Sequence, residues 1–137
     1  MRLSNNFSLE EFTKSKTADS LNILNVPALV HITNLQHLCT SVLQPIRDKW
    51  NKPIFISGGY RCRALNKAVG GVPTSQHLLG EAADLICEDN KSLWYLIKSM
   101  IENGEIKVGQ LIDEKNLSWI HISLPSENKC NQIFKIQ

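Results

Sequence analysis

The stretch SQHLLGEAADL, residues 75–85, decides how we interpret this chain. Gly80 and the two alanines after it let the backbone pass from a loop into a tightly packed strand, which we expect over residues 82–87. His77 closes the loop and Asp84 lies in the strand. An imidazole nitrogen and a carboxylate oxygen can therefore converge on one cation, with ligand distances of about 2.0–2.2 Å. The sequence indicates two ligands of a metal site.

His121 is the candidate for the third ligand. It lies in the middle of WIHIS, where Ile120 and Ile122 point to the opposite face of a predicted strand. Two imidazoles, one carboxylate and an open fourth position are typical of a catalytic zinc site, and imidazoles favour zinc over magnesium. A histidine in a strand is also commonly a hydrogen-bonded core residue, so spacing alone leaves both interpretations open.

Working outward, the apolar pattern predicts one domain over residues 1–137, of class α+β with a small antiparallel sheet packed against helices. The expected elements are a helix from Pro27 past Ile46 that Pro45 kinks or divides, a strand in KPIFIS, a helix through residues 63–69, a helix capped by Asn90 and ended by Asn103 and Gly104, a hairpin between Lys107 and Ser123, and a strand over residues 132–136.

Composition excludes several classes of protein. The chain has 42% hydrophobic and 20% charged residues, and its net charge of +2 is scattered, with no run of five like charges. This pattern provides neither a nucleic-acid-binding arm nor a membrane-binding patch. No run approaches the roughly 18 apolar residues of a membrane span. We expect a soluble monomer that binds no nucleic acid and no membrane.

The four cysteines and the first residues bear on the compartment. No CxxC pair is present, which excludes a zinc ribbon or a redox motif, and we expect four buried thiols, with one disulfide in an exported product as the alternative. MRLSNNFSLEEF lacks the apolar centre of a signal peptide, which favours synthesis in the cytoplasm.

Several motifs together resemble a known family. ISGGYR, LNKAVGG and SQHLLGEAADL, followed by QLIDE and WIHIS, are similar to the D-alanyl-D-alanine carboxypeptidase-type zinc peptidases, which are related to phage L-alanyl-D-glutamate endopeptidases and to the amino-terminal domain of hedgehog proteins. The resemblance runs from about Asn5 to Ser123. It implies a hedgehog/DD-peptidase-like fold and a Zn²⁺ ion bound by His77, Asp84 and His121.

The resemblance also implies roles around the metal. Arg61 would hold a substrate carboxylate or support the polarised carbonyl, for which its planar charge is suited; the alternative is a structural ion pair. Ser75 would line the site, or only cap the turn before the first histidine. Tyr60 and Gln110 would complete the substrate-binding residues. Gly58 stands where relatives usually have serine, a change that we expect to alter loop flexibility more than chemistry.

The general base is less obvious. Many relatives have an acidic residue three positions before the last zinc histidine, but Ser118 stands there. Glu114, seven positions before His121, resembles the acidic residue six positions ahead in the hedgehog domain. A two- or four-residue turn would put Gln110, Glu114 and His121 on one face, whereas a three-residue turn would select Asp113. To reach the metal, Glu114 would need the hairpin to twist over the site. A site with neither acid as base is the third possibility.

These features predict a zinc metallopeptidase that hydrolyses peptide bonds of bacterial peptidoglycan beside D-amino acids. The alternative is a non-catalytic zinc-containing module, which binds a wall peptide or a protein partner, or which forms part of a phage particle. Because a wall-cleaving enzyme without a signal peptide needs another route out of the cytoplasm, we expect release by phage lysis, a dedicated secretion route or delivery on a phage tail.

Overall fold

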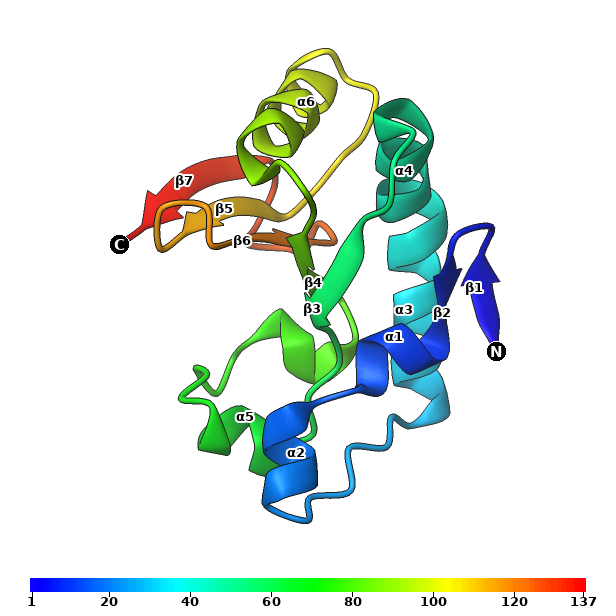
Figure 1. Ribbon diagram of the computed structural model, residues 1–137, viewed down its shortest axis with the longest axis vertical. Coiled ribbons are helices and arrows are strands. Elements are labelled where there is room, and N and C mark those ends of the chain that lie inside the picture. Colours follow the sequence, from blue (N-terminus) through cyan, green and yellow to red (C-terminus); the bar gives the residue numbers. More distant parts are fainter.

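A five-stranded sheet forms the centre of the molecule, and helices cover one of its faces (Figure 1). The computed structural model describes residues 1–137. The elements, in chain order, are β1 (Arg2–Ser4), β2 (Phe7–Ser8), α1 (Leu9–Thr13), α2 (Lys16–Ser20), α3 (Leu29–Leu38), the π-helix η1 (Cys39–Leu43), α4 (Gln44–Trp50), β3 (Phe55–Gly58), α5 (Arg63–Ala68), the 3₁₀ helix η2 (Gln76–Leu79), β4 (Ala82–Ile86), α6 (Asn90–Glu102), β5 (Gln110–Glu114), β6 (Trp119–Ser123) and β7 (Gln132–Ile136). The predicted α+β class is confirmed.

The sheet has the strand order β3-β4-β6-β5-β7. The first four strands pair antiparallel, but β7 runs parallel to β5, so the sheet is mixed rather than antiparallel throughout. A separate two-stranded hairpin, β1-β2, lies beside the column of helices formed by α3, η1 and α4 (Figure 1).

The two faces of the central sheet differ in character. On one face, Ala83 and Leu85 of β4 lie opposite Ile122 and Ile120 of β6, and all four are fully buried. They belong to a single core of 23 residues that includes apolar side chains of α3, α4 and α6. Because side chains alternate along a strand, the other face carries Asp84 and its neighbours. One face therefore supplies the hydrophobic core and the other is left for the site.

The long helix predicted after Pro27 is confirmed, with an irregular centre. The π-helix η1 interrupts it, and the N–H of Gln44 donates to the carbonyl of Cys39. The wider π turn ends immediately before Pro45, whose nitrogen has no hydrogen to donate in a regular α-helical turn. The disturbance that the sequence predicted at this proline is therefore absorbed without ending the helix.

The predicted cap of α6 is wrong. Asp89, not Asn90, caps α6: its carboxylate accepts the N–H of Ser92 at 3.0 Å. Asn90 is the first residue of the helix, and its amide bridges the N–H of Cys87 to the carbonyl of Leu117. Asn90 thus joins two loops rather than capping the helix.

The cysteines are all unpaired, and only Cys39 is buried. The prediction of four buried thiols is therefore wrong for Cys62, Cys87 and Cys130. Burial, reinforced by the charge of Glu11, raises the pKa of Cys39 to about 12. No helix in the structure has the length and apolar character that a membrane crossing requires.

Candidate metal centre

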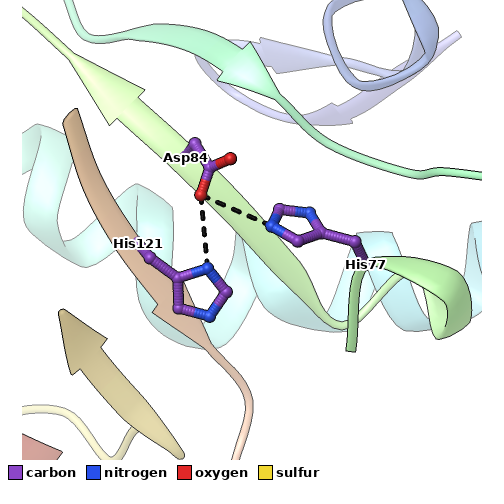
Figure 2. A group of neighbouring side chains, drawn as sticks. All are labelled: His77, Asp84 and His121. Carbon is purple, nitrogen blue, oxygen red and sulfur yellow. Dashed lines mark hydrogen bonds and ion pairs between the residues drawn. The ribbon is translucent and has the colours of Figure 1, made fainter. Parts of the chain in front are cut away.

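Strand register brings two of the predicted ligands together. Asp84 of β4 lies directly opposite His121 of β6, so both side chains project from the same face of the sheet. His77 comes from η2, which precedes β4 by a single tight turn (Figure 2). Ser75 caps η2 through its hydroxyl, which accepts the N–H of His77 at 3.1 Å, and Gly80 ends it with φ at +73°. The chain therefore reverses within a few residues and returns the aspartate to the histidine.

The spacing of the donor atoms fits one zinc ion. Nε2 of His77 lies 3.4 Å from Oδ1 of Asp84, and Nδ1 of His121 lies 3.2 Å from the same oxygen. Tetrahedral ligands at about 2.0–2.2 Å from a zinc ion stand about 3.3–3.6 Å apart. All three donors lie within 4.8 Å of one another. The donor set and its spacing match a site with three protein ligands and a fourth position for water or substrate.

A backbone carbonyl fixes the orientation of His77. Its Nδ1 lies 2.7 Å from the carbonyl oxygen of Gly59. Because a carbonyl only accepts hydrogen bonds, Nδ1 carries a proton, which leaves Nε2 as the ring nitrogen that can bind a metal. The imidazole is therefore held in the orientation that a metal ligand requires.

Asp84 is held as an anion. Burial by itself raises the pKa of its carboxyl, but hydrogen bonds and charge interactions with His121 and His77 outweigh burial and hold that pKa below its usual range. The side chain is 7% exposed. At neutral pH the carboxylate is thus ready to bind a cation without first losing a proton.

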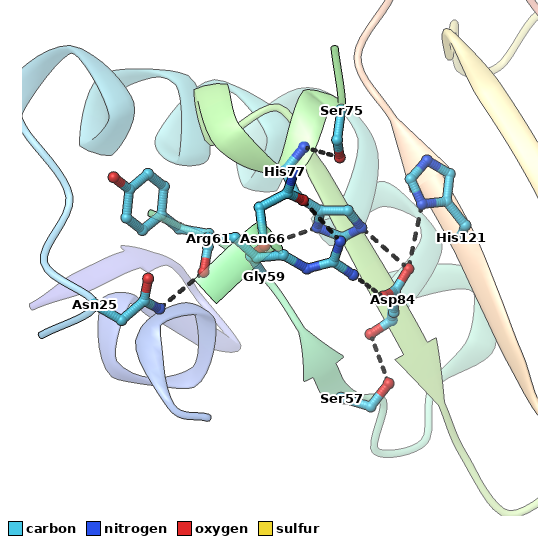
Figure 3. Close-up of polar contacts among 10 residues, drawn as sticks. Asn25, Ser57, Gly59, Arg61, Asn66, Ser75, His77, Asp84 and His121 are labelled. Carbon is cyan, nitrogen blue, oxygen red and sulfur yellow. Dashed lines mark hydrogen bonds and ion pairs between the residues drawn. The ribbon is translucent and has the colours of Figure 1, made fainter. Parts of the chain in front are cut away.

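Arg61 contacts the second oxygen of the same carboxylate. Its Nη2 lies 3.6 Å from Oδ2 of Asp84, and its Nη1 donates to Oδ1 of Asn66 at 3.3 Å (Figure 3). The backbone N–H of Arg61 also donates to the carbonyl of His77. The structural ion pair that we considered is therefore present. The Arg61 side chain is nevertheless one-fifth exposed, and it lines a cavity beside the site.

Gly58 packs against the aspartate. It lies opposite Asp84 in the β3-β4 register, and a Cβ built on it would come within 2.8 Å of Oδ2. The expectation that this departure from the family pattern alters loop flexibility is therefore wrong, because Gly58 belongs to a strand and gives the carboxylate its space. Sequence reasoning also missed Asn66, although the motif LNKAVGG contains it.

The remaining predicted substrate-binding residues lie at two places. Tyr60 stacks on His31 with ring centroids 5.0 Å apart, and it lines the same cavity as Arg61 and Ser75. Gln110 lies at the far side, on β5, where its amide donates to the side chain of Gln132 on β7. The cavity thus unites three of the four residues, and Gln110 lies apart from them.

The hairpin register puts the two candidate bases on opposite faces of the sheet. Its turn has four residues, 115–118, and Glu114 lies opposite Trp119. Glu114 is therefore the diagonal neighbour of His121 on the same face, a separation of about 7–8 Å between backbones that long side chains can bridge. It is not one of the clustered metal donors.

Asp113 faces the other way. It lies opposite Ile120, which is in the core, and its carboxylate accepts the N–H of Leu117 at 2.7 Å. Residues 115–117 all have positive φ, between +49° and +59°. Asp113 therefore stabilises a strained turn, and the register leaves Glu114 as the acid on the site face.

Comparison with known proteins agrees with this geometry. The family model described as Peptidase M15 matches residues 5–123. The chain belongs to the Peptidase M15 family. M15 peptidases are generally zinc-dependent, and the family includes D-Ala-D-Ala carboxypeptidases and phage-type endopeptidases. No curated protein matched the chain. The matched residues include all three candidate ligands of this M15 peptidase, whereas β7 lies outside them.

Proposed function

We propose that this M15 peptidase hydrolyses peptide bonds of bacterial peptidoglycan, beside D-amino acids, with one Zn²⁺ held by His77, Asp84 and His121. The observation that carries the proposal is the spacing of these three buried donors, which fits one tetrahedral ion. One of the donors, the carboxylate of Asp84, is held as an anion. The chemistry that zinc supplies when bound is Lewis acidity and a water molecule that ionises near neutral pH.

Glu114 is the general base in this proposal. Its carboxylate takes a proton from the attacking water and passes it to the nitrogen of the leaving amine. Its support is the register, which puts it diagonally across from His121 on the site face. The four-residue turn that follows it is fastened at Leu117, whose N–H donates to Asp113 and whose carbonyl accepts from the amide of Asn90. These contacts keep the end of β5 in a defined position relative to the metal ligands.

Arg61 binds a carboxylate of the substrate. Two of its contacts, to Asp84 and Asn66, fix the guanidinium plane, while its exposed edge faces the adjoining cavity. A planar group with fixed donors suits bidentate binding of a carboxylate. Tyr60 and Ser75 form the wall of that cavity, and Gln110 contributes from β5. The protein acts as a monomer on the cell wall, after release or delivery of the phage type.

The test compares release of new amines from purified peptidoglycan by the zinc-loaded protein and two matched variants. Glu114→Gln removes the base, and we expect it to lower the rate by about 10²–10⁴-fold with zinc content unchanged. Asp113→Asn makes the same change, from carboxylate to carboxamide, at the neighbouring acid, and we expect this variant to keep most of the activity. Release of amines that survives both His77→Ala and chelation would refute the proposal.

A second candidate is a non-catalytic module that binds a wall peptide. The observation that favours it is Ser118, which stands where many relatives have an acid and which hydrogen-bonds to the turn through its hydroxyl. A binding module would sediment with peptidoglycan equally well as wild type and as Glu114→Gln, and neither form would release amines. A rate that depends on Glu114 excludes this candidate.

A further inference from the structure

The cavity of about 1040 Å³ beside the metal centre extends beyond Arg61, Tyr60 and Ser75, and its far wall has no role in the proposed function. Its walls come from α5, the loop that follows it, η2 and the start of α3. It shares two lining residues, Arg61 and Ser75, with the surroundings of the candidate metal ligands. The hydroxyl of Ser75 accepts the backbone N–H of His77. A substrate that contacts Arg61 at the metal centre therefore has this cavity next to it.

The charges that line the cavity are all of one sign. Arg61, Arg63 and Lys67 line it, and no aspartate or glutamate does. Neither Arg63 nor Lys67 forms an ion pair in the structure, and both are exposed. A concave surface lined by cations alone focuses a positive potential and attracts anions.

The cationic wall rests on a fixed support. Arg63 and Lys67 are four residues apart on α5, so they project from the same side of that helix. Asn66 between them is 4% exposed, and its amide donates to the carbonyl of Val72 while its oxygen accepts from Arg61. This residue joins the helix, the following loop and the arginine at the metal centre. The cavity is therefore formed before any ligand arrives, as binding pockets usually are.

We propose that this cavity binds an anionic group of the peptide substrate, a carboxylate additional to the one that Arg61 holds. The inference rests on the proposed function, because it assigns the substrate class of the same site. Arg63 and Lys67 make charge-assisted hydrogen bonds to the second carboxylate, and Arg61 is shared between the cavity and the scissile bond. The substrate is accordingly an acidic peptide.

The test uses two synthetic wall peptides that differ in one group, a carboxylate in the first and a carboxamide in the second. We expect wild type to have a KM about tenfold lower for the carboxylate peptide, with similar kcat for both. The double variant Arg63→Gln, Lys67→Gln removes this preference by raising KM for the carboxylate peptide alone. Raising the ionic strength from about 0.05 to 0.5 M narrows the preference of wild type.

The control removes the same charge elsewhere. Lys91→Gln with Lys107→Gln changes two exposed lysines that line no described cavity, and we expect the preference to be retained. Equal KM values of wild type for the two peptides, or an equal loss in the control and the cavity variant, would overturn the inference.

A binding measurement separates this inference from the proposed function. The same peptides are titrated calorimetrically into zinc-loaded Glu114→Gln, with and without the two substitutions on α5. A preference for the carboxylate that depends on Arg63 and Lys67, without hydrolysis by wild type, would support the cavity and refute the peptidase. Hydrolysis without any preference would leave the peptidase and refute the cavity.

Discussion

Replacement of Gly58 by alanine is the sharpest test of how the site is built. The added Cβ would lie 2.8 Å from Oδ2 of Asp84, whereas ordinary contacts begin at 3.4 Å, so the oxygen must move by about 0.6 Å. Because the carboxylate is planar and rigid, rotation that moves Oδ2 also moves Oδ1. Plausible zinc–ligand distances lie within about 0.2 Å of their usual values, so a displaced donor atom weakens the site.

Relatives usually have serine, and hence a Cβ, at this position, so we expect Gly58→Ala to weaken zinc binding by about tenfold, the lower end of the range found when groups that orient metal ligands are changed. The added Cβ would contact only Asp84 among the three candidate ligands, so a change in zinc affinity would report on the position of that carboxylate. Affinity is measured by competition with a chromophoric chelator at neutral pH. Circular dichroism and urea unfolding verify that the variant is folded, with a stability loss of about 1–3 kcal/mol from the tighter packing.

Gly104→Ala is the matched control. Gly104 follows α6 with φ at +76°, and a Cβ there meets nothing within 4 Å. Its substitution costs about 1 kcal/mol of folding stability through backbone strain and leaves the zinc affinity unchanged. Wild-type zinc affinity in folded Gly58→Ala, or an equal loss of affinity in Gly104→Ala, would refute the idea that the glycine positions the carboxylate.

Three further predictions follow from contacts described above. Asp113→Ala removes the acceptor for the N–H of Leu117 in a strained turn, so we expect a loss of about 1–2 kcal/mol in unfolding free energy with kcat unchanged; a large fall in kcat at equal stability would contradict it. Arg61→Lys keeps the charge but loses bidentate geometry, so KM for an acidic peptide should rise about tenfold while zinc affinity changes little; an unchanged KM would exclude carboxylate binding by Arg61. Because the pKa of Cys39 is raised to about 12 from 9.0, the unfolded chain loses this proton first as pH rises. Above pH 9 the unfolding free energy of wild type should therefore fall more steeply than that of Cys39→Ala, by up to about 1.4 kcal/mol per pH unit. Urea unfolding at several pH values measures both, and an equal pH dependence in the two proteins would refute the raised pKa of Cys39.

The clustering of the three candidate metal ligands could be predicted in part, because their geometry is local or periodic. His77 and Asp84 are joined by a short turn that Gly80 permits, so their convergence follows from seven residues of sequence. The face that His121 occupies follows from strand alternation in WIHIS. The register that sets Asp84 opposite His121 could not be predicted in this way. It depends on the pairing of residues 35 or more positions apart in the chain.

The residues that support the ligands were harder to foresee. Gly58 and Asn66 act through close packing and hydrogen bonds to distant segments, which no periodicity reveals. The choice of Glu114 over Asp113 depended on the length of one turn, and three consecutive residues with positive φ are not suggested by Lys115 and Leu117, which rarely adopt that conformation. The parallel pairing of β7 likewise depends on the path of the preceding loop.

The central claim is that three side chains hold one zinc ion with a position left open. Anomalous diffraction at the zinc absorption edge, from crystals grown with zinc, tests it most directly. We expect a single peak about 2.0–2.2 Å from Nε2 of His77, Oδ1 of Asp84 and Nδ1 of His121. A peak elsewhere, or none at this point with the side chains separated beyond bonding distance, would contradict it.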